Sequence, residues 1–522
     1  MSERRLLHHA TRMAAVTFGS RLTGYVRDKA LAWVLGADTL NDAFRTAFRI
    51  PNAFRALLAE GALHAAFVPA LSKLGDDGDD GRAARELVRG VSAALLLALA
   101  VVVGLGILAS PLLVRLYAQG FAEQPGKLAL TVWMNRLMFP YLAFISMAAL
   151  CQGVLNSRER FLLPAFTPVL FNLVLAASAW WLVRDARHAP TVLALAVLVG
   201  GALQFAVQLP AVRRLGFSLR PLWRAARSPT VRRVMLLMLP GVAVLGLNQV
   251  NQLVTSLFAS YLGDGAVTSQ FYAYRVTELM YGGLIVQMTT VLLPVLSRQL
   301  REDPAEAPGT LLDTVALVSF VTLPTAVLLV VASRPVIGLL FGGGAFGADA
   351  IDVTSRTLAA YAFGLLGTAH AKVMASAFFA QGNTRAPMWG TAAALVMFTV
   401  AAAVLVRPLG VPGLGLANTV AMLLYAGVLT TWYVRRYGLG DVRIAPAVTS
   451  FVRQAGAAAA VGAAVWAFRD VLATIDRTGV DEAIRLAVVL VPAGLAYAGL
   501  VTLAGGGETR AMLDAVRGRG RR

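Results

Sequence analysis

Six basic residues lie within one apolar stretch near the start of the chain, residues 20–72. They are Arg21, Arg27, Lys29, Arg45, Arg49 and Arg55, and only Asp28, Asp38, Asp42 and Glu60 oppose them. A charge held at the centre of a membrane costs about 2.5 to 3.5 kcal/mol on insertion scales, so such residues face a partner, a wet cavity or a ligand rather than lipid. The surplus of guanidinium groups predicts a site for an anion, and phosphate suits their forked geometry.

The first charged segment separates its charges by helical face. At about 100° per residue, Arg21 and Asp28 fall on one face, and Arg27 points to the side. The alternative interpretation is that such residues are anchors that snorkel to lipid headgroups, or ion pairs that only fix helix packing. Snorkelling works near helix ends, whereas these cations are spread along two helices with too few acids to neutralise them. We therefore favour a binding site.

The second charged segment places Asp42, Arg45 and Arg49 on one helical face. One carboxylate neutralises only one of the two arginines, and like charges four residues apart repel each other, so this face needs an anion from elsewhere. Pro51 is expected to kink or interrupt the helix and to free backbone groups beside the arginines. An anionic ligand would satisfy both needs.

The elements that hold these charges are predicted to be membrane-spanning helices. The 522 residues are 57% hydrophobic and only 14% charged, which is typical of an all-α polytopic membrane protein. The net charge of +19 is divided among alternate loops, and no nucleic-acid-binding motif accompanies it, so nucleic acid is not expected as a partner. Fourteen spans are predicted, at residues 12–35, 40–71, 88–112, 131–154, 161–183, 190–211, 231–261, 267–297, 311–333, 351–381, 386–406, 412–434, 449–468 and 484–504.

Basic residues set the expected orientation. The loop at 212–233 holds seven arginines, and the tail after Glu508 holds five. With an even number of spans, the positive-inside rule places both termini and the basic loops in the cytoplasm, and loops such as 36–40 and 261–269 on the other side. No removable signal peptide is expected. Cys151 is the only cysteine, which excludes an intramolecular disulfide.

The sequence also repeats itself at a spacing of about 225 residues. The matching pairs are FVPALSKL (67–74) with LLPVLSRQL (292–300), LVRLYAQGFA (113–122) with IGLLFGGGAFG (337–347), AFRIPN (47–52) with AYRVTE (273–278), and QGVLNSR (152–158) with QGNTR (381–385). The third pair aligns Arg49 with Arg275. Such a duplication predicts two six-helix lobes, 1–220 and 221–440, around a central cationic cavity, followed by two extra helices and a basic tail at 441–522.

Motifs for enzymatic chemistry are missing from the sequence. Gly126 and Lys127 lack the upstream glycine spacing and the following serine or threonine of a Walker A loop. The five histidines show no metal-ligand spacing, and the acidic run at 76–81 misses the calcium-loop pattern. We therefore expect a transporter and not an enzyme, with no cofactor or bound metal. Its energy source is expected to be a coupling ion or the membrane potential, and no motif identifies an ion.

Two runs in the charged stretch carry a family resemblance. SRLTGYVRD at 20–28 and DAFRTAFRIPNAFRALLAEGALHAAFVPALS at 42–72 resemble the N-terminal signature of the MurJ/MviN lipid II flippases of the MOP exporter superfamily. The resemblance extends through the hydropathy of nearly the whole chain, with its specific motifs at 20–72 and around Arg275. It implies a protein of the bacterial inner membrane that flips lipid II, the undecaprenyl-diphosphate-linked peptidoglycan precursor, from the cytoplasmic to the periplasmic leaflet.

The resemblance also implies roles for individual residues. The charged cavity positions of the family match Arg21, Arg27, Asp42, Arg55 and Arg275, and Ser20, Asp28 and Glu60 belong to the same motif. Arg49 joins this predicted substrate site from its helical face and its alignment with Arg275. Arg45 departs from the family pattern, in which an apolar residue is common.

The same resemblance suggests which molecules the chain meets. The last two helices are expected to form a groove for the lipid tail, and lipid II and the surrounding membrane lipids are the expected partners. Proteins of cell-wall synthesis and division are further candidates. Two alternatives stay open: another MOP exporter of an anionic lipid-linked oligosaccharide, and a membrane scaffold for cell-wall synthesis. A drug antiporter of that superfamily would be expected to have an acidic site, which is the opposite sign.

Overall fold

The computed structural model describes residues 3–58, 62–75, 78–183, 185, 187–282, 286–440, 442–472 and 479–510. These residues form helices joined by short turns, and the β-bridge found among them, between Gly343 and Phe346, is an isolated one. Ten stretches of the described chain are long and apolar enough to cross a membrane. The predicted all-α, polytopic fold is confirmed.

The four remaining predicted spans are also helical over their described residues. They are 12–35, 40–71, 231–261 and 267–297. The first two carry the charges of the predicted site, which lowers their hydropathy below that of an ordinary span. The total of fourteen therefore stays a prediction, although the described residues of each predicted segment are mostly helical.

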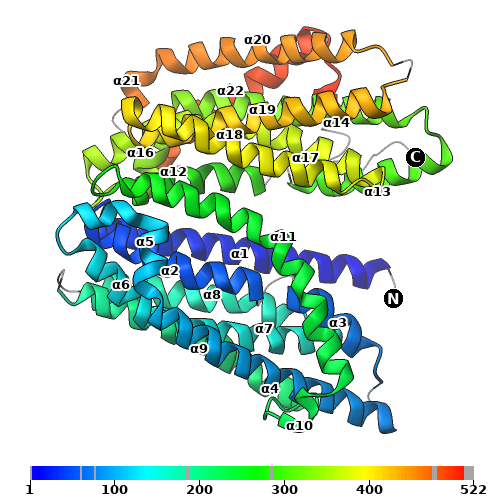
Figure 1. Cartoon of the computed structure of the whole chain (residues 1–522). Coiled ribbons are helices and arrows are strands. Elements are labelled where there is room, and N and C mark those ends of the chain that lie inside the picture. Colours follow the sequence, from blue (N-terminus) through cyan, green and yellow to red (C-terminus); the bar gives the residue numbers. More distant parts are fainter. Residues whose placement is uncertain are drawn as a thin grey trace. The chain divides into compact units, whose positions relative to one another are not determined.

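The described residues divide into two compact units, Met1–Val267 and Thr268–Arg522. The helices of the first unit are α1 (Glu3–Leu35), α2 (Thr39–Leu58), α3 (Ala62–Ser72), α4 (Gly78–Leu108), α5 (Ser110–Ala118), the short η1 (Gln119–Glu123), α6 (Lys127–Met138), α7 (Tyr141–Ser157), α8 (Leu162–Ala177), η2 (Ser178–Leu182), α9 (Ala189–Arg214), α10 (Trp223–Ala226) and α11 (Pro229–Ser260). Figure 1 shows them in blue to green, with α1 beside α8 and α9 beside α7.

An aromatic cluster fixes α2 within the first unit. The ring of Phe48 lies 5.6 Å from that of Tyr141 on α7 and 5.8 Å from that of Phe171 on α8. Aromatic pairs at such distances add about 0.5 to 1.5 kcal/mol to the free energy gained from burial. Helix α2, which carries the second group of charges, is thus packed on α7 and α8. This packing fixes the positions of its charged residues along the helix axis.

Helix α11 packs on α2, α3 and α5 of the first unit. The predicted lobes divide the chain by its repeat, at residue 220, whereas compactness divides it after Val267. The first helix of the second repeat is therefore part of the first unit. The turn that follows α11 belongs to the same unit, which brings residues 261–267 next to the N-terminal helices.

The second unit is also a bundle of helices. Its members are α12 (Ala266–Met280), which begins two residues before the unit boundary, α13 (Val286–Glu302), α14 (Ala307–Val331), α15 (Ser333–Phe341), α16 (Ala348–Ala362), α17 (Gly364–Ala380), α18 (Arg385–Leu409), α19 (Val411–Tyr437), α20 (Ala445–Ala467), α21 (Arg469–Leu472) and α22 (Val480–Leu503). The two C-terminal helices α20 and α22 pack on each other and on α14, where the rings of Phe320 and Tyr497 lie 5.1 Å apart.

Two pairs of helices have the order and length that the predicted duplication requires. The nine-residue α5 begins at Ser110 and the nine-residue α15 at Ser333, 223 residues later. The seventeen-residue α7 and α17 begin at Tyr141 and Gly364, with the same offset. By the same relation, the turn after α1 corresponds to the turn after α11. These two turns meet in the candidate site.

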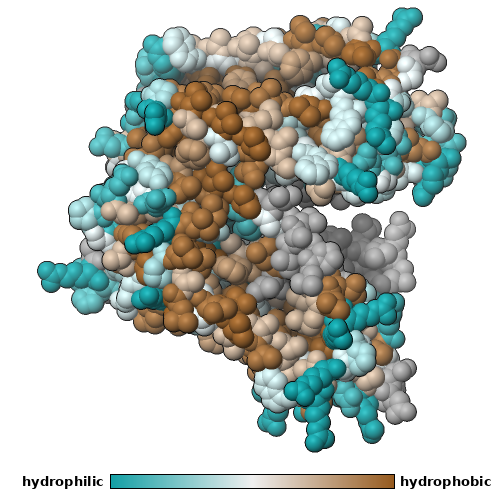
Figure 2. All heavy atoms as spheres, in the orientation of Figure 1, coloured by the Kyte–Doolittle hydropathy of each residue, from teal (hydrophilic) through white to brown (hydrophobic). Residues whose placement is uncertain are grey.

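The surface of each unit fits a membrane environment. In both, the visible sides of the helices are largely hydrophobic, and hydrophilic side chains gather toward the helix ends (Figure 2). Large apolar side chains such as Leu108, Leu112, Trp181 and Val404 are well exposed. A soluble protein rarely leaves such extended apolar surface in water, so this surface is suited to lipid.

Candidate functional site

Arg27 is held between α1 and α8. Its Nη2 and Nε donate to Asp28 Oδ1 at 2.7 and 3.1 Å, and its Nη1 donates to Asn172 Oδ1 at 3.1 Å. Asp28 is buried, and the arginine side chain is mostly buried. Three of the five guanidinium N–H groups are used in this way, and within the described part of the chain the other two have no protein acceptor. Arg27 is thus fixed in position and keeps two donors for an anionic ligand.

Asn172 connects this arginine to a second predicted residue. Its Nδ2 donates to the backbone carbonyl of Ser20 at 3.3 Å, while its Oδ1 accepts from Arg27. Sequence reasoning missed Asn172 and had not paired Arg27 with Asp28. The available signal was a single amide inside the apolar run LLPAFTPVLFNLVLAA, because an isolated polar residue in a span usually faces a partner within the bundle.

Depth along the helices separates the predicted site into two levels. A helix rises about 1.5 Å per residue, so Arg27 lies about 12 Å before the end of α1, and Arg49 about 15 Å beyond the start of α2. Asp42 lies only about 5 Å beyond that start. Arg27 and the half-buried Arg49 are therefore at similar depth, and Asp42 is near the turn that joins α1 to α2.

Asp42 has partners that sequence reasoning did not foresee. Its Oδ2 accepts from Lys127 Nζ at 2.9 Å and from the backbone N–H of Gly265 at 2.8 Å, and the carboxylate is fully buried. A carboxylate with one negative charge cannot neutralise Lys127 together with Arg45 and Arg49. Asp42 therefore contributes less to balancing Arg45 and Arg49 than its helical face predicted.

Lys127 is a buried cation at the start of α6. Its Nζ donates to Asp42 and, at 2.8 Å, to Asp264 Oδ1, and it lies 4.4 Å from the centre of the Phe121 ring. Gly126, with φ of 75°, precedes it and supplies the left-handed turn that starts the helix. Sequence reasoning had considered Lys127 only as part of a nucleotide-binding loop. The usable signal was a lysine at the start of a predicted span, on the side predicted to have few cations.

Asp264 completes this cluster from the turn between α11 and α12. Its Oδ1 accepts from Thr39 Oγ1 at 2.6 Å as well as from Lys127, and its side chain is 54% exposed. Burial by itself would raise the pKa of this carboxyl, but the hydrogen bonds from Lys127 and Thr39 outweigh it and hold the pKa below its usual value. Asp264 is therefore charged at neutral pH.

The other predicted residues of the first unit are more scattered. Arg21 is exposed, and the half-buried Arg55 donates from Nε to Asn52 Oδ1 at 2.8 Å, within its own helix. Pro51 was expected to kink or interrupt the segment, but α2 continues through it to Leu58, so it does not interrupt the helix. Glu60 lies outside the described residues.

Arg275 belongs to α12 in the second unit. Its Nη1 donates to Glu278 Oε2 at 2.8 Å, one helical turn further on, and the two side chains are 39% and 50% exposed. Exposed ion pairs of this kind contribute about 0 to 1 kcal/mol. The ion pair with Glu278 is therefore a weak one.

One protein family matches most of the chain. Its sequence profile, described as "Lipid II flippase MurJ", covers residues 31–475. A probable lipid II flippase MurJ from Rhizobium meliloti (strain 1021) is 37% identical over 472 residues, which are 88% of this chain and 86% of that protein. A lipid II flippase MurJ from Burkholderia cenocepacia is 36% identical, over 80% of this chain and 82% of its own.

Solved structures agree on the fold. The structure titled "Lipid II flippase MurJ, inward closed conformation" is similar with a TM-score of 0.75 at 21% identity, over 94% of this chain and 98% of that chain. An inward-facing multidrug resistance MATE family transporter of the MOP superfamily is similar with a TM-score of 0.65 at 15% identity, over 80% of this chain and 94% of its own. Both likenesses concern the fold, and the sequence relatives carry the family assignment.

Proposed function

Since the family profile and the relatives show that this chain belongs to the lipid II flippase MurJ family, we propose that it moves lipid II across the bacterial cytoplasmic membrane. The observation that carries the proposal is the match over residues 31–475, which spans both repeats. The direction is from the cytoplasmic to the periplasmic leaflet. Movement alternates access to the site by rocking of the two repeats. No bond of the substrate is made or broken, so the chain acts as a transporter.

The arginines of the first unit hold the diphosphate of the lipid. Arg27 supports this role because Asp28 and Asn172 fix its guanidinium while two N–H groups stay available. Two parallel N–H donors match two oxygens of a phosphate, which adds strength and orientation to the contact. Arg49 lies at similar depth, and the exposed Arg21 is positioned to meet the headgroup earlier. Arg275 supplies a further guanidinium from the second unit.

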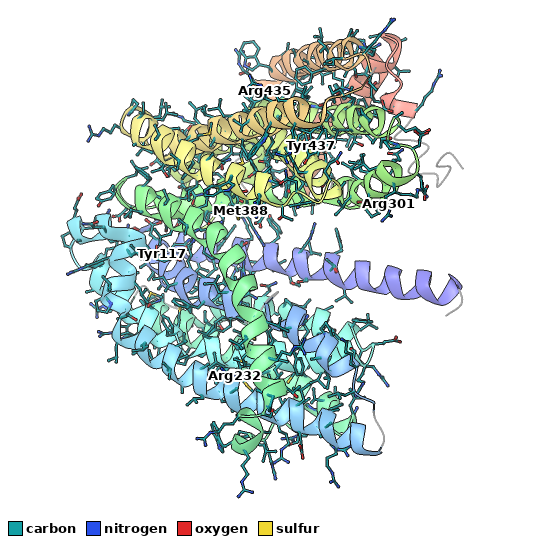
Figure 3. All side chains as sticks on the ribbon, turned by 45° about the vertical axis from the view of Figure 1, so that its right-hand side comes forward. Tyr117, Arg232, Arg301, Met388, Arg435 and Tyr437 are labelled. Carbon is teal, nitrogen blue, oxygen red and sulfur yellow. The ribbon has the colours of Figure 1, made fainter. Side chains whose placement is uncertain are left out.

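Orientation follows from the basic end of the first unit. Arg227, Arg232 and Arg233 line a cavity of about 370 Å³ around the start of α11. Figure 3 places Arg232 far along the first unit from Tyr117 of α5. It is Tyr117 that lies at the end of the unit with the α1–α2 and α11–α12 turns, because the N–H of Gly120, three residues further on, donates to Ser260 at the end of α11. Clustered arginines favour the cytoplasmic side. We place both termini in the cytoplasm and the two turns in the periplasm on this basis.

The membrane potential can favour one direction of the conformational change that carries the substrate. A cationic cavity changes its net charge when an anionic diphosphate enters, and each charge moved across 100 mV is worth about 2.3 kcal/mol. The empty carrier and the loaded carrier therefore respond differently to the potential. Dissipating the potential is expected to slow transport without weakening lipid II binding.

The alternatives differ in what they require of the charges. A drug antiporter is expected to use acids for cationic substrates, whereas the charged residues of α1 and α2 are mainly basic. A scaffold for proteins of cell-wall synthesis and division, acting without transport, would keep its function when cavity charges are removed. Transport of lipid II therefore separates these functions directly.

The decisive experiment measures lipid II in each leaflet. Cells depleted of their own lipid II flippase receive this chain, and outward-facing lipid II is quantified by its accessibility to an external probe. The parent chain is expected to restore outward-facing lipid II, and Arg27→Ala is expected not to. Restoration of growth by a chain that leaves lipid II in the inner leaflet would overturn the proposal in favour of the scaffold.

A further inference from the structure

The turn between α11 and α12, residues 261–265, is attached to the first unit by polar contacts at both of its ends. Asp264 accepts from Lys127 at 2.8 Å and from Thr39 at 2.6 Å, and the N–H of Gly265 donates to Asp42 at 2.8 Å. Just before the turn, Ser260 Oγ accepts from the N–H of Gly120 at 3.1 Å. Four separate hydrogen bonds thus connect the turn and the residue before it to α2, to η1 and to α6.

Two glycines let the backbones meet at this place. Gly265 has φ of 76°, and a Cβ atom there would lie 2.3 Å from the carbonyl oxygen of Ala37. A Cβ atom on Gly120 would lie 2.5 Å from the carbonyl oxygen of Ser260. No L-residue with a side chain fits either contact without moving the backbone. The turn is therefore seated closely on a complementary surface.

The two ion pairs of Lys127 differ in burial. The pair with Asp42 is entirely buried, and separating it would leave an uncompensated charge inside the protein. In the pair with Asp264, the carboxylate is 54% exposed, so water can solvate it when the pair separates. Lys127 would meanwhile remain bound to Asp42. The cluster can therefore open at Asp264 without exposing a bare charge to the interior.

We propose that Lys127 is a positioning residue for transport, which holds the α11–α12 turn on the first unit as an electrostatic latch. Asp42 is the permanent anchor of the lysine, and Asp264 is the releasable arm. The latch is closed in this structure, and it opens when the turn leaves Lys127 during the cycle. This inference rests on the proposed function for its role in transport, but the latch itself is measurable without lipid II.

A purely structural ion pair is the competing explanation. In that case the Asp264 arm would add stability to the folded unit without controlling the position of the turn. Ala266, the residue after the turn, distinguishes the two cases because it is buried while the turn is seated. A cysteine at this position becomes reactive only when the turn lifts, so its labelling rate reports the open fraction of the latch.

The experiment measures maleimide labelling of Ala266→Cys in the full-length purified chain, with Cys151→Ala in the background to remove the natural thiol. Asp264→Asn removes the releasable arm and is expected to label about two- to fivefold faster, as for the loss of an exposed ion pair. Glu123→Gln removes the same charge from an exposed acid four residues before Lys127 and is expected to label like the parent. Equal rates for Asp264→Asn and Glu123→Gln would overturn the latch.

A second set of variants keeps the test independent of folding defects. Lys127→Arg retains the cation and is expected to label slowly, whereas Lys127→Met is expected to label faster than Asp264→Asn because it removes both pairs. If Lys127→Met does not accumulate, Asp264→Asn and Lys127→Arg still decide the matter. Since no lipid is present, fast labelling of Asp264→Asn supports the latch even if the chain proves not to transport lipid II.

Discussion

The ammonium group of Lys127 lies 2.9 Å from the carboxylate of Asp42, with both side chains fully buried and 85 residues between them in the sequence. Breaking a buried pair by removing one partner typically costs about 3 to 5 kcal/mol, because the other charge is left uncompensated. The first ion pair to test in this protein therefore includes Lys127, which lies outside the charged stretch at residues 20–72.

Asp42→Asn is expected to lower the stability of the purified chain, and to lower it more than Asp264→Asn does. The double variant Asp42→Asn with Lys127→Met should be more stable than Lys127→Met alone, because it leaves no bare buried charge. Thermal unfolding of the parent, Asp42→Asn, Lys127→Met and the double variant measures the coupling between Asp42 and Lys127. Additive effects would show that Asp42 does not depend on Lys127, and tighter lipid binding with unchanged stability would indicate that Asp42 acts in the transport cycle.

Arg27→Ala should abolish lipid II transport in the depletion assay while the protein still accumulates. Arg27→Lys keeps the charge but loses the fork that contacts Asp28 and Asn172, so partial activity is expected. Asn172→Ala should reduce transport less than Arg27→Ala. Arg160→Ala, at an exposed arginine, is the matched control. Full activity of Arg27→Ala would reduce this residue to a packing element.

Arg275 and Glu278 should behave differently although they form one pair. Arg275→Ala is expected to abolish transport, since it removes a phosphate donor. Glu278→Gln should change stability by no more than about 1 kcal/mol and leave transport in place, because the pair is exposed. Transport rates normalised to protein level give the comparison. Equal losses in both variants would indicate that transport requires the ion pair itself and not the guanidinium group of Arg275 alone.

Cysteines at positions 220 and 262 should react from opposite sides of the membrane. Arg220 lies in the basic loop predicted to be cytoplasmic, and Leu262 lies in the α11–α12 turn predicted to be periplasmic. Leu262 is chosen over Gly265 because the positive φ of Gly265 does not suit a side chain. An impermeant thiol reagent applied to intact cells should label only position 262. Labelling of both from one side would overturn the orientation and with it the placement of the latch.

The latch should weaken in acid. The pKa of Asp264 is below its ordinary value of 3.8 in the folded chain, so its contribution is present above that value and is lost as the pH falls through the folded pKa. The melting temperature of the parent should therefore fall more steeply below about pH 4 than that of Asp264→Asn. Parallel curves for the two proteins would show that Asp264 carries no net stabilisation.

The local sequence was enough to predict the helical segments, the repeat and the class of ligand. Arginines inside an apolar stretch predict an anionic ligand whatever the fold, because the cost of a charge in lipid does not depend on which helices surround it, and this ligand stays a prediction. Hydropathy predicted helical segments that the structure contains. Similar sequence segments about 225 residues apart predicted a repeat, and the positions of α5 and α15 and of α7 and α17 agree with it. These properties depend on neighbours in sequence, so the sequence shows them.

Only the tertiary structure decided which charges meet. Lys127 is separated from Asp42 by 85 residues and from Asp264 by 137, and nothing in their local sequence pairs them. Their contact depends on α11 packing on the first unit and on Gly120 and Gly265 allowing backbones to touch. Arg27 likewise needed α8 to supply Asn172. Periodicity places a charge on a helical face, but the partner of that face is set by helix packing, which depends on the shapes of side chains far apart in the chain.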